Sequence, residues 1–131
     1  MVVVEHVDLK EAMWNDERGW GLNPIEVVEL HGGAIPSIHV VSMKPGAVRG
    51  NHHHVGASEW ILVCSGEVKF AWRDGEALSE TCISVGEKYP VMFRVAPGVE
   101  HAVCNISDET IYLLCFSDLK SYETVRGSSL L

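Results

Sequence analysis

Two histidines one residue apart, His52 and His54, are the side chains of this sequence best placed to do chemistry together. Side chains two residues apart in a β-strand point to the same face, so both imidazoles can face one point while His53 faces away. Glu59 follows them closely, and His101 comes after a later Pro-Gly pair. Imidazole and carboxylate groups suit Zn²⁺, Fe²⁺, Mn²⁺ or Ni²⁺. The candidate ligands of a divalent metal ion are therefore His52, His54, Glu59 and His101.

The chemistry of such a site depends on whether a metal is bound. Three neutral nitrogens and one carboxylate leave coordination positions open, as in catalytic rather than closed structural sites. Without a metal, His52 or His54 would act as a general base, and Glu59 could be a strand-end carboxylate in solvent. Tyr89 and Tyr112 are candidate acids that the sequence does not place.

The elements that must position these residues are short strands. Alternating apolar segments separated by Gly, Pro, Asn and Asp run along the chain, which predicts an all-β sandwich or barrel. Asp74-Gly75 indicates a hairpin, and a second hairpin turn is expected at residues 65–67. Further turns are expected at residues 16–19, 31–33 and 44–46. Besides the strand with the paired histidines, the expected strands are residues 25–30, 37–43, 59–64, 68–72, 78–85, 91–95, 102–106 and 110–116.

One domain is expected, because a chain of 131 residues suits a single hydrophobic core. We divide it into an N-terminal arm at residues 1–23, a barrel at 24–117 and a C-terminal tail at 118–131. The tail is expected to form a short helix or an edge strand. The four cysteines include no C-x-x-C pair, so we expect buried thiols rather than a zinc-thiolate site.

Charge and hydropathy exclude some partners. The formal net charge is −8, and the ten basic residues are scattered singly, whereas nucleic-acid binding needs clustered Lys and Arg. No apolar run approaches the length of a membrane span, and no signal-peptide pattern opens the chain. We therefore expect a cytoplasmic protein that binds a small molecule and neither nucleic acid nor membrane.

In these motifs the chain resembles the cupin superfamily. The first cupin motif is a glycine, two histidines one residue apart, a glutamate and a second glycine, and it is matched without a gap by Gly46, His52, His54, Glu59 and Gly66. The resemblance implies an RmlC-like jelly-roll β-barrel, also called a double-stranded β-helix, in an all-β single domain. It also implies a homodimer, since cupins commonly pair.

The second cupin motif is matched at its end by Gly98, His101 and Asn105. Its start departs from the pattern, because proline stands at Pro97 and the candidate leading glycine, Gly86, lies farther upstream than the pattern asks. The amide of Asn105 suits two roles equally, a cap of a turn near the strand end or a residue near the pocket.

The string Arg49-Gly50-Asn51-His52-His53-His54 resembles the R-G-x-H-x-H segment of cupins that act on nucleotide-linked sugars. That group includes keto-sugar isomerases and epimerases and the cupin domains of capsular polysaccharide enzymes. The resemblance implies that a histidine, His52 or His54, moves a proton next to a keto group. It also implies that Arg49 meets the anionic part of the substrate, since a guanidinium can bind phosphate bidentately. A turn arginine paired with a carboxylate is the alternative for Arg49.

Three function classes follow for a metal-binding small-molecule protein. The favoured one is an isomerase or epimerase acting on a carbohydrate, with an anionic sugar nucleotide as substrate. The second is a metal-dependent dioxygenase, in which iron binds dioxygen at an open position. The third is a non-catalytic module that binds or senses a small ligand at the barrel mouth.

Overall fold

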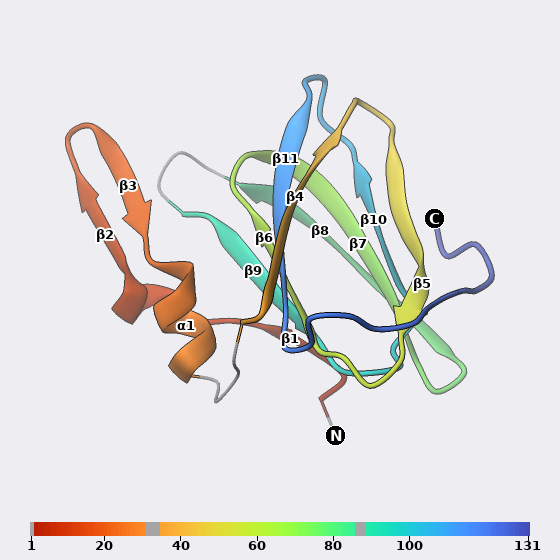
Figure 1. Cartoon of the computed structure of the whole chain (residues 1–131). Coiled ribbons are helices and arrows are strands. Elements are labelled where there is room, and N and C mark those ends of the chain that lie inside the picture. The colour runs from red at the N-terminus through yellow and green to blue at the C-terminus, as the bar shows by residue number, and fades with distance from the viewer. Residues whose placement is uncertain (1, 31–34, 86–88) are drawn as a thin grey trace.

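Two five-stranded antiparallel sheets lie face to face and form the body of the molecule (Figure 1). This computed structural model describes residues 2–30, 35–85 and 89–131. The first sheet has the strand order β1-β9-β6-β11-β4 and the second the order β12-β5-β10-β7-β8. The first sheet consists of β1 (Val4–His6), β9 (Val91–Val95), β6 (Glu59–Val63), β11 (Ile111–Ser117) and β4 (Ser37–Met43). The second consists of β12 (Thr124–Arg126), β5 (Val48–His54), β10 (His101–Asn105), β7 (Gly66–Asp74) and β8 (Ala77–Val85).

The main core lies between the two sheets. Ile61 and Phe93 of the first sheet and Phe70 and Val103 of the second are all buried in it. Phe70 and Phe93 stack with ring centroids 4.6 Å apart, which ties one sheet to the other. Nearly all regular structure is β, and two facing sheets are the arrangement of a jelly roll, so the all-β prediction is confirmed. No helix among the described residues is long and apolar enough to cross a membrane.

The N-terminal region covers the outer face of the first sheet. It contains a 3₁₀ turn, η1 (Lys10–Ala12), a hairpin of β2 (Met13–Asp16) and β3 (Gly19–Leu22), and a helix, α1 (Pro24–Leu30). Figure 1 shows the hairpin standing away from the two sheets. Val27 and Val28 of α1 pack with Trp60 and Leu62 of β6 in a second core. Strand β6 is therefore buried on both faces, as its apolar sequence predicts.

The prediction of a strand at residues 25–30 is wrong, because this segment is the helix α1. The local signals favour the helix: Asn23 accepts a hydrogen bond from the backbone N–H of Glu26 at 3.4 Å, and proline suits the first helical position. Over so short a segment, the spacing of the apolar residues fits both the two-residue period of a strand and the 3.6-residue period of a helix. The turn expected at residues 31–33 and the glycine Gly86 lie outside the described residues.

The hairpin predicted at residues 65–67 is also wrong. Strands β6 and β7 flank this turn but belong to different sheets, so the chain crosses over here. At this crossover Gly66 has a φ of 79°, and a Cβ there would lie 2.5 Å from the Ile111 side chain, so the position requires glycine. The hairpin at Asp74-Gly75 is confirmed by the pairing of β7 with β8.

The C-terminal tail contains an edge strand, one of the two forms expected for it. Strand β12 pairs with β5 in the register Thr124↔His54, Val125↔His53 and Arg126↔His52. At the other end of the chain, β1 extends the first sheet by pairing with β9. Both terminal segments therefore complete sheets, and Figure 1 shows the end of the chain running beside β5.

Candidate active site

Three histidines and one glutamate, from three strands, meet at one end of the space between the sheets. His52 and His54 lie on β5, His101 begins β10, and Glu59 begins β6 of the opposite sheet. The ring centroids of His52 and His54 are 4.6 Å apart, and those of His52 and His101 are 5.0 Å apart. The structure thus brings together four residues that are separated by up to about fifty positions in the sequence.

Strand β5 is irregular where it approaches β10. Gly50 has a φ of 102° and Asn51 a φ of 57°, and the register with β10 shifts between His101 and Ala102. Bulges of this kind change the direction in which a strand aims its side chains. A Cβ on Gly50 would lie 2.6 Å from the His101 carbonyl oxygen, so only glycine allows β10 to come this close.

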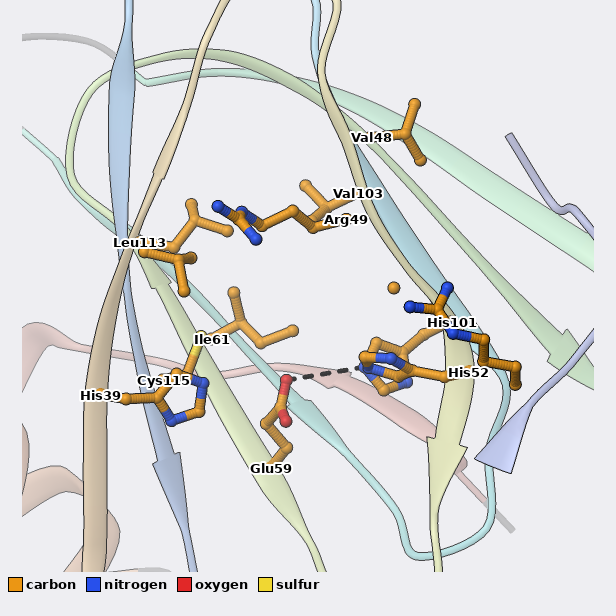
Figure 2. Close-up of a pocket in the computed structure, with 13 residues that line it drawn as sticks. His39, Val48, Arg49, His52, Glu59, Ile61, His101, Val103, Leu113 and Cys115 are labelled. Carbon is orange, nitrogen blue, oxygen red and sulfur yellow. Dashed lines mark ion pairs between the residues drawn. The ribbon is translucent and has the colours of Figure 1, made fainter. Parts of the chain in front are cut away.

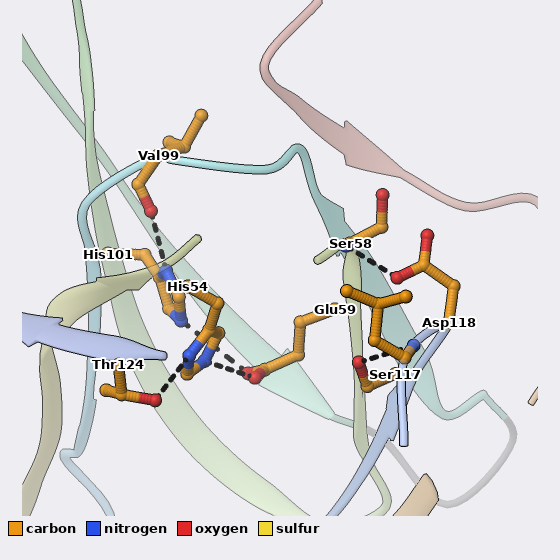
Figure 3. A network of polar contacts seen from close by, with 9 residues as sticks. His54, Ser58, Glu59, Val99, His101, Ser117, Asp118 and Thr124 are labelled. Carbon is orange, nitrogen blue, oxygen red and sulfur yellow. Dashed lines mark hydrogen bonds and ion pairs between the residues drawn. The ribbon is translucent and has the colours of Figure 1, made fainter. Parts of the chain in front are cut away.

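The carboxylate of Glu59 is directed at two of the histidines, His54 and His101 (Figure 3). One carboxylate oxygen is 2.7 Å from Nε2 of His54, and the other is 3.5 Å from Nε2 of His101. The Nδ1 of His101 donates to the Val99 carbonyl oxygen at 2.9 Å, which keeps its proton on Nδ1. Because Glu59 is only 6% exposed, it is not the solvated strand-end carboxylate considered above.

The surroundings set the charge of the site. Burial raises the pKa of Glu59, but close polar contacts with His101 and His54 outweigh it and lower that pKa to about 2. Burial lowers the pKa of His52 to about 4, helped by the charges of His101 and His54. At neutral pH, therefore, Glu59 is an anion and His52 is a neutral imidazole with a free lone pair.

The three imidazoles fit a divalent metal ion. One ring nitrogen from each of His52, His54 and His101 can be chosen so that all lie within 4.8 Å of one another. The Nε2 of His54 is buried and, among the described residues, has no aligned hydrogen-bond partner, because its short contact with Glu59 lacks hydrogen-bond geometry. An imidazole donor set with a buried orphan nitrogen suits Zn²⁺, Fe²⁺ or Ni²⁺. In the present arrangement the carboxylate of Glu59 contacts two of these rings.

A cavity of about 340 Å³ opens beside the cluster. Figure 2 shows His52 and His101 on one side of it, Glu59 at its base, and His39 with Cys115 opposite. Such a volume lies in the range of small-molecule sites. The residues that line it are His39, Val41, Val48, Arg49, Gly50, His52, Glu59, Ile61, His101, Val103, Leu113, Cys115 and Arg126. His54 is absent from this lining, so it lies behind the cavity wall and contacts the lining residue Glu59 from there.

The side chain of Arg49 extends from β5 of the second sheet to β4 of the first sheet at the cavity. Its Nε and Nη2 donate to the Ser42 carbonyl oxygen at 3.0 and 2.9 Å, and Ser42 lies on β4 of the opposite sheet. Within the described parts of the chain, no carboxylate forms an ion pair with Arg49, so the paired turn arginine considered as an alternative is not observed. A fixed guanidinium at the cavity leaves other N–H groups to meet an anion.

Sequence reasoning missed His39 and Cys115 on the cavity wall, and it also missed three residues of the tail. Thr124 Oγ1 is 3.0 Å from Nδ1 of His54, the Tyr122 ring packs edge-on against His54 at 4.7 Å, and Arg126 lines the cavity. Burial and the charge of Glu59 raise the pKa of Tyr122, so this phenol keeps its proton. No local motif marks the three tail residues, because their roles arise from the pairing of β12 with β5.

Other candidates lie away from the cavity or have structural roles. Tyr89 and Tyr112 are 60% and 56% exposed and do not line it. The Asn105 amide is fully buried and donates to the carbonyl oxygens of Met43 and Glu109 at 2.9 and 2.8 Å. Asn105 therefore caps a turn, which was one of its two expected roles.

Comparison with known proteins places this site in a family. Residues 14–125 match the sequence model of the polysaccharide biosynthesis C-terminal domain. The chain belongs to this family. Among curated proteins, no sequence matches the chain. As a member of the polysaccharide biosynthesis C-terminal domain family, it has the RmlC-like cupin jelly roll that its two motifs predict, and the solved structures agree with this fold.

Three solved structures illustrate the likeness. A double mutant of the 3,4-ketoisomerase QdtA from Thermoanaerobacterium thermosaccharolyticum, crystallised with TDP, has a TM-score of 0.77 at 16% identity over 97% of this chain and 89% of that one. A dTDP sugar isomerase from Desulfovibrio desulfuricans has a TM-score of 0.77 at 16% identity over 95% and 83%. The capsular polysaccharide assembling protein CapF from Staphylococcus aureus has a TM-score of 0.61 at 22% identity, over 71% of this chain. This chain covers 27% of the length of CapF.

Proposed function

We propose that this protein binds a nucleoside diphosphate sugar and isomerises or epimerises its keto sugar by moving a proton next to the carbonyl group. The observation that carries the proposal is a neutral imidazole, His52, beside an ionised carboxylate, Glu59, in a cavity that is also lined by Arg49. The solved ketoisomerase and dTDP sugar isomerase structures, which share the fold, support the same reaction class.

The proposed reaction requires one proton to leave and return. A base takes the proton from the carbon next to the keto group, the C–H electron pair forms a carbon–carbon double bond, and the carbonyl π electrons move to oxygen as an enediolate. Return of a proton to the other carbon, with transfer of the hydroxyl proton to the former carbonyl oxygen, gives the isomeric ketone. Return to the opposite face of the same carbon gives the epimer. No oxidant or reductant is consumed.

The residues divide these tasks by position. His52 faces the cavity with a free lone pair, so we assign it the proton from carbon. His52 then carries that proton and can return it, while His101, which also lines the cavity, contacts Glu59 through its Nε2 and helps to place the carboxylate. His54 is held between Thr124 and Glu59, and we assign it the role of positioning the carboxylate. Arg49 meets the anionic part of the substrate.

A divalent ion, if bound, would be held by His52, His54 and His101, with Glu59 as a fourth ligand if it turns away from the histidines. It would supply charge to polarise the carbonyl oxygen and stabilise the enediolate. The proton transfers above use only the side chains of this chain. Removal of the metal therefore tests how much the ion adds to the rate of the reaction.

The test of the proposal is exchange of the substrate's carbon-bound proton with solvent deuterium. TDP-4-keto-6-deoxyglucose, the sugar nucleotide crystallised with a QdtA variant, and its UDP counterpart are incubated with the protein in D₂O, and NMR follows deuterium at the carbons next to the keto group. We expect enzyme-dependent exchange that His52→Gln slows by a factor on the order of 100 or more. His53→Gln is the matched control, since its side chain lies on the opposite face of β5. No exchange by the unmodified protein with either sugar, together with no binding of TDP or UDP, would refute the proposal.

The homodimer stays a prediction, and β4 is the edge that could form it. Among the described strands, β4 pairs only with β11, and Ile38 and Val40 on it are 49% and 62% exposed. An exposed strand edge with apolar side chains can pair with a second copy. Light scattering during gel filtration gives the mass, and Val40→Lys should shift a dimer toward monomer.

A further inference from the structure

The C-terminal strand β12 adds a second arginine to the cavity. In an antiparallel pair, directly opposite residues share a face of the sheet. The register therefore places Thr124 and Arg126 on the same face as His54 and His52, and Val125 on the face of His53. The hydrogen-bond contact of Thr124 with His54 and the presence of Arg126 in the cavity lining agree with this assignment.

The strand that carries Arg126 is fixed on both sides. Before it, the backbone N–H of Val55 donates to the Glu123 carbonyl oxygen at 2.9 Å, and after it, the N–H of Gly127 donates to the Asn51 carbonyl oxygen at 2.9 Å. Farther on, the N–H of Leu130 donates to the Asn51 side chain at 2.7 Å, and the Leu130 side chain is buried against the second sheet. The backbone of Arg126 is therefore held in place beside His52.

Arg126 forms no ion pair with a carboxylate that the structure describes. Among the side chains that the structure describes, those of residues 2–28, 35–85 and 89–131, no acidic group forms an ion pair or hydrogen bond with its guanidinium, although the protein as a whole carries a net charge of −8. Its charge instead opposes protonation of His52. An exposed cation on a fixed strand beside three imidazoles, with no ion pair of its own in an acidic protein, suits an anionic ligand.

We propose that Arg126 binds the phosphate next to the sugar, while Arg49 binds the phosphate next to the nucleoside. This assignment rests on the proposed function, which places the sugar at His52 and Glu59. Arg126 lies directly opposite His52 in the sheet, whereas Arg49 lies three residues away along β5, opposite Val103. Two separated guanidinium groups make the site selective for a diphosphate over a monophosphate, because the monophosphate lacks the group that Arg126 contacts.

The test compares two probes, thymidine diphosphate and thymidine monophosphate, by isothermal titration calorimetry. Arg126→Gln should weaken diphosphate binding by about tenfold or more, since a charge-assisted contact is lost, and change monophosphate binding by less than about threefold. Arg126→Glu should lower the ratio of the two affinities further. Arg49→Gln should weaken both probes. Arg18→Gln is the matched control, because Arg18 is exposed on the distant β2–β3 hairpin and pairs with Asp16.

The outcomes separate this inference from the proposed function. If the unmodified protein prefers diphosphate and the preference is unchanged in both Arg126 variants, the role of Arg126 is wrong and the proposed function stands. If the unmodified protein binds diphosphate no better than thymidine, which is titrated as a phosphate-free reference, both are wrong. Weaker binding in higher salt, with a smaller salt dependence in Arg126→Gln than in the unmodified protein, is the additional result expected for a phosphate contact.

Discussion

Replacement of Glu59 by glutamine should remove a specific part of the protein's resistance to acid. Glu59 is buried between His54 and His101, and these contacts hold its folded-state pKa near 2, against an ordinary value of 4.5. A carboxyl group whose pKa is lower in the folded state stabilises the fold above its unfolded pKa, and this contribution is lost as the pH falls through the folded pKa. The window for Glu59 therefore runs from about pH 4.5 down to about pH 2.

The size of the effect follows from the shift. A difference of about 2.5 pKa units corresponds to about 3 kcal/mol of unfolding free energy, of which about 2 kcal/mol is lost between about pH 6 and about pH 3. Domains of this kind have a total stability of about 5–15 kcal/mol. Loss of the Glu59 contribution is therefore large enough to measure.

The assay is urea unfolding, followed by tryptophan fluorescence, at a series of pH values in the presence of a chelator. The unmodified protein should lose about 2 kcal/mol more than Glu59→Gln between about pH 6 and about pH 3. Glu17→Gln is the control, because Glu17 is exposed in the β2–β3 turn. If Glu59→Gln and the unmodified protein lose stability in parallel over this window, the histidine contacts do not stabilise the carboxylate and the reasoning is refuted.

Three other substitutions probe the rest of the site. Gly50→Ala should lower the free energy of unfolding by about 2 kcal/mol or more, because a Cβ there meets the His101 carbonyl oxygen; an unchanged urea midpoint would count against the bulge. In His52→Gln, the free energy of unfolding should fall less between about pH 6.5 and about pH 4 than in the unmodified protein. Burial lowers the folded-state pKa of His52, so in this window the unfolded chain binds a proton that the folded protein does not. A pH series of thermal melts measures the difference, and an unaltered profile would contradict the lowered pKa. His101→Ala should lower the zinc retained after loading and dialysis, measured by atomic emission, by tenfold or so; full retention would exclude His101 as a ligand.

Most strands could be predicted because their signals are local. The alternation of Val68, Phe70 and Trp72 and the Asp74-Gly75 turn fix a strand and its hairpin without reference to the rest of the chain. The errors arose where a local pattern fits two structures. Residues 25–30 suit a strand or a helix, and the helix forms because Asn23 and Pro24 favour its start and the outer face of β6 buries Val27 and Val28.

The histidines of the site could be named from their spacing, but their partners could not. Period-two alternation tells which face of a strand a side chain occupies, and it says nothing about which strand lies beside it. The pairing of β12 with β5 joins residues about seventy positions apart, and it alone brings Thr124 and Arg126 to the cluster. For the same reason, Tyr122 rather than Tyr89 or Tyr112 is the tyrosine at the histidines.

The sequence by itself determined an all-β cupin chain with two imidazoles on one strand face, a glutamate on the next strand and a third imidazole after a turn, since each feature depends on neighbours in the chain. Only the tertiary structure decided that Glu59 contacts two of these rings, that His54 lies behind the cavity, and that two arginines line it. Burial, distance and the pairing of remote strands set those properties, and they exist only once the two sheets have closed around the site.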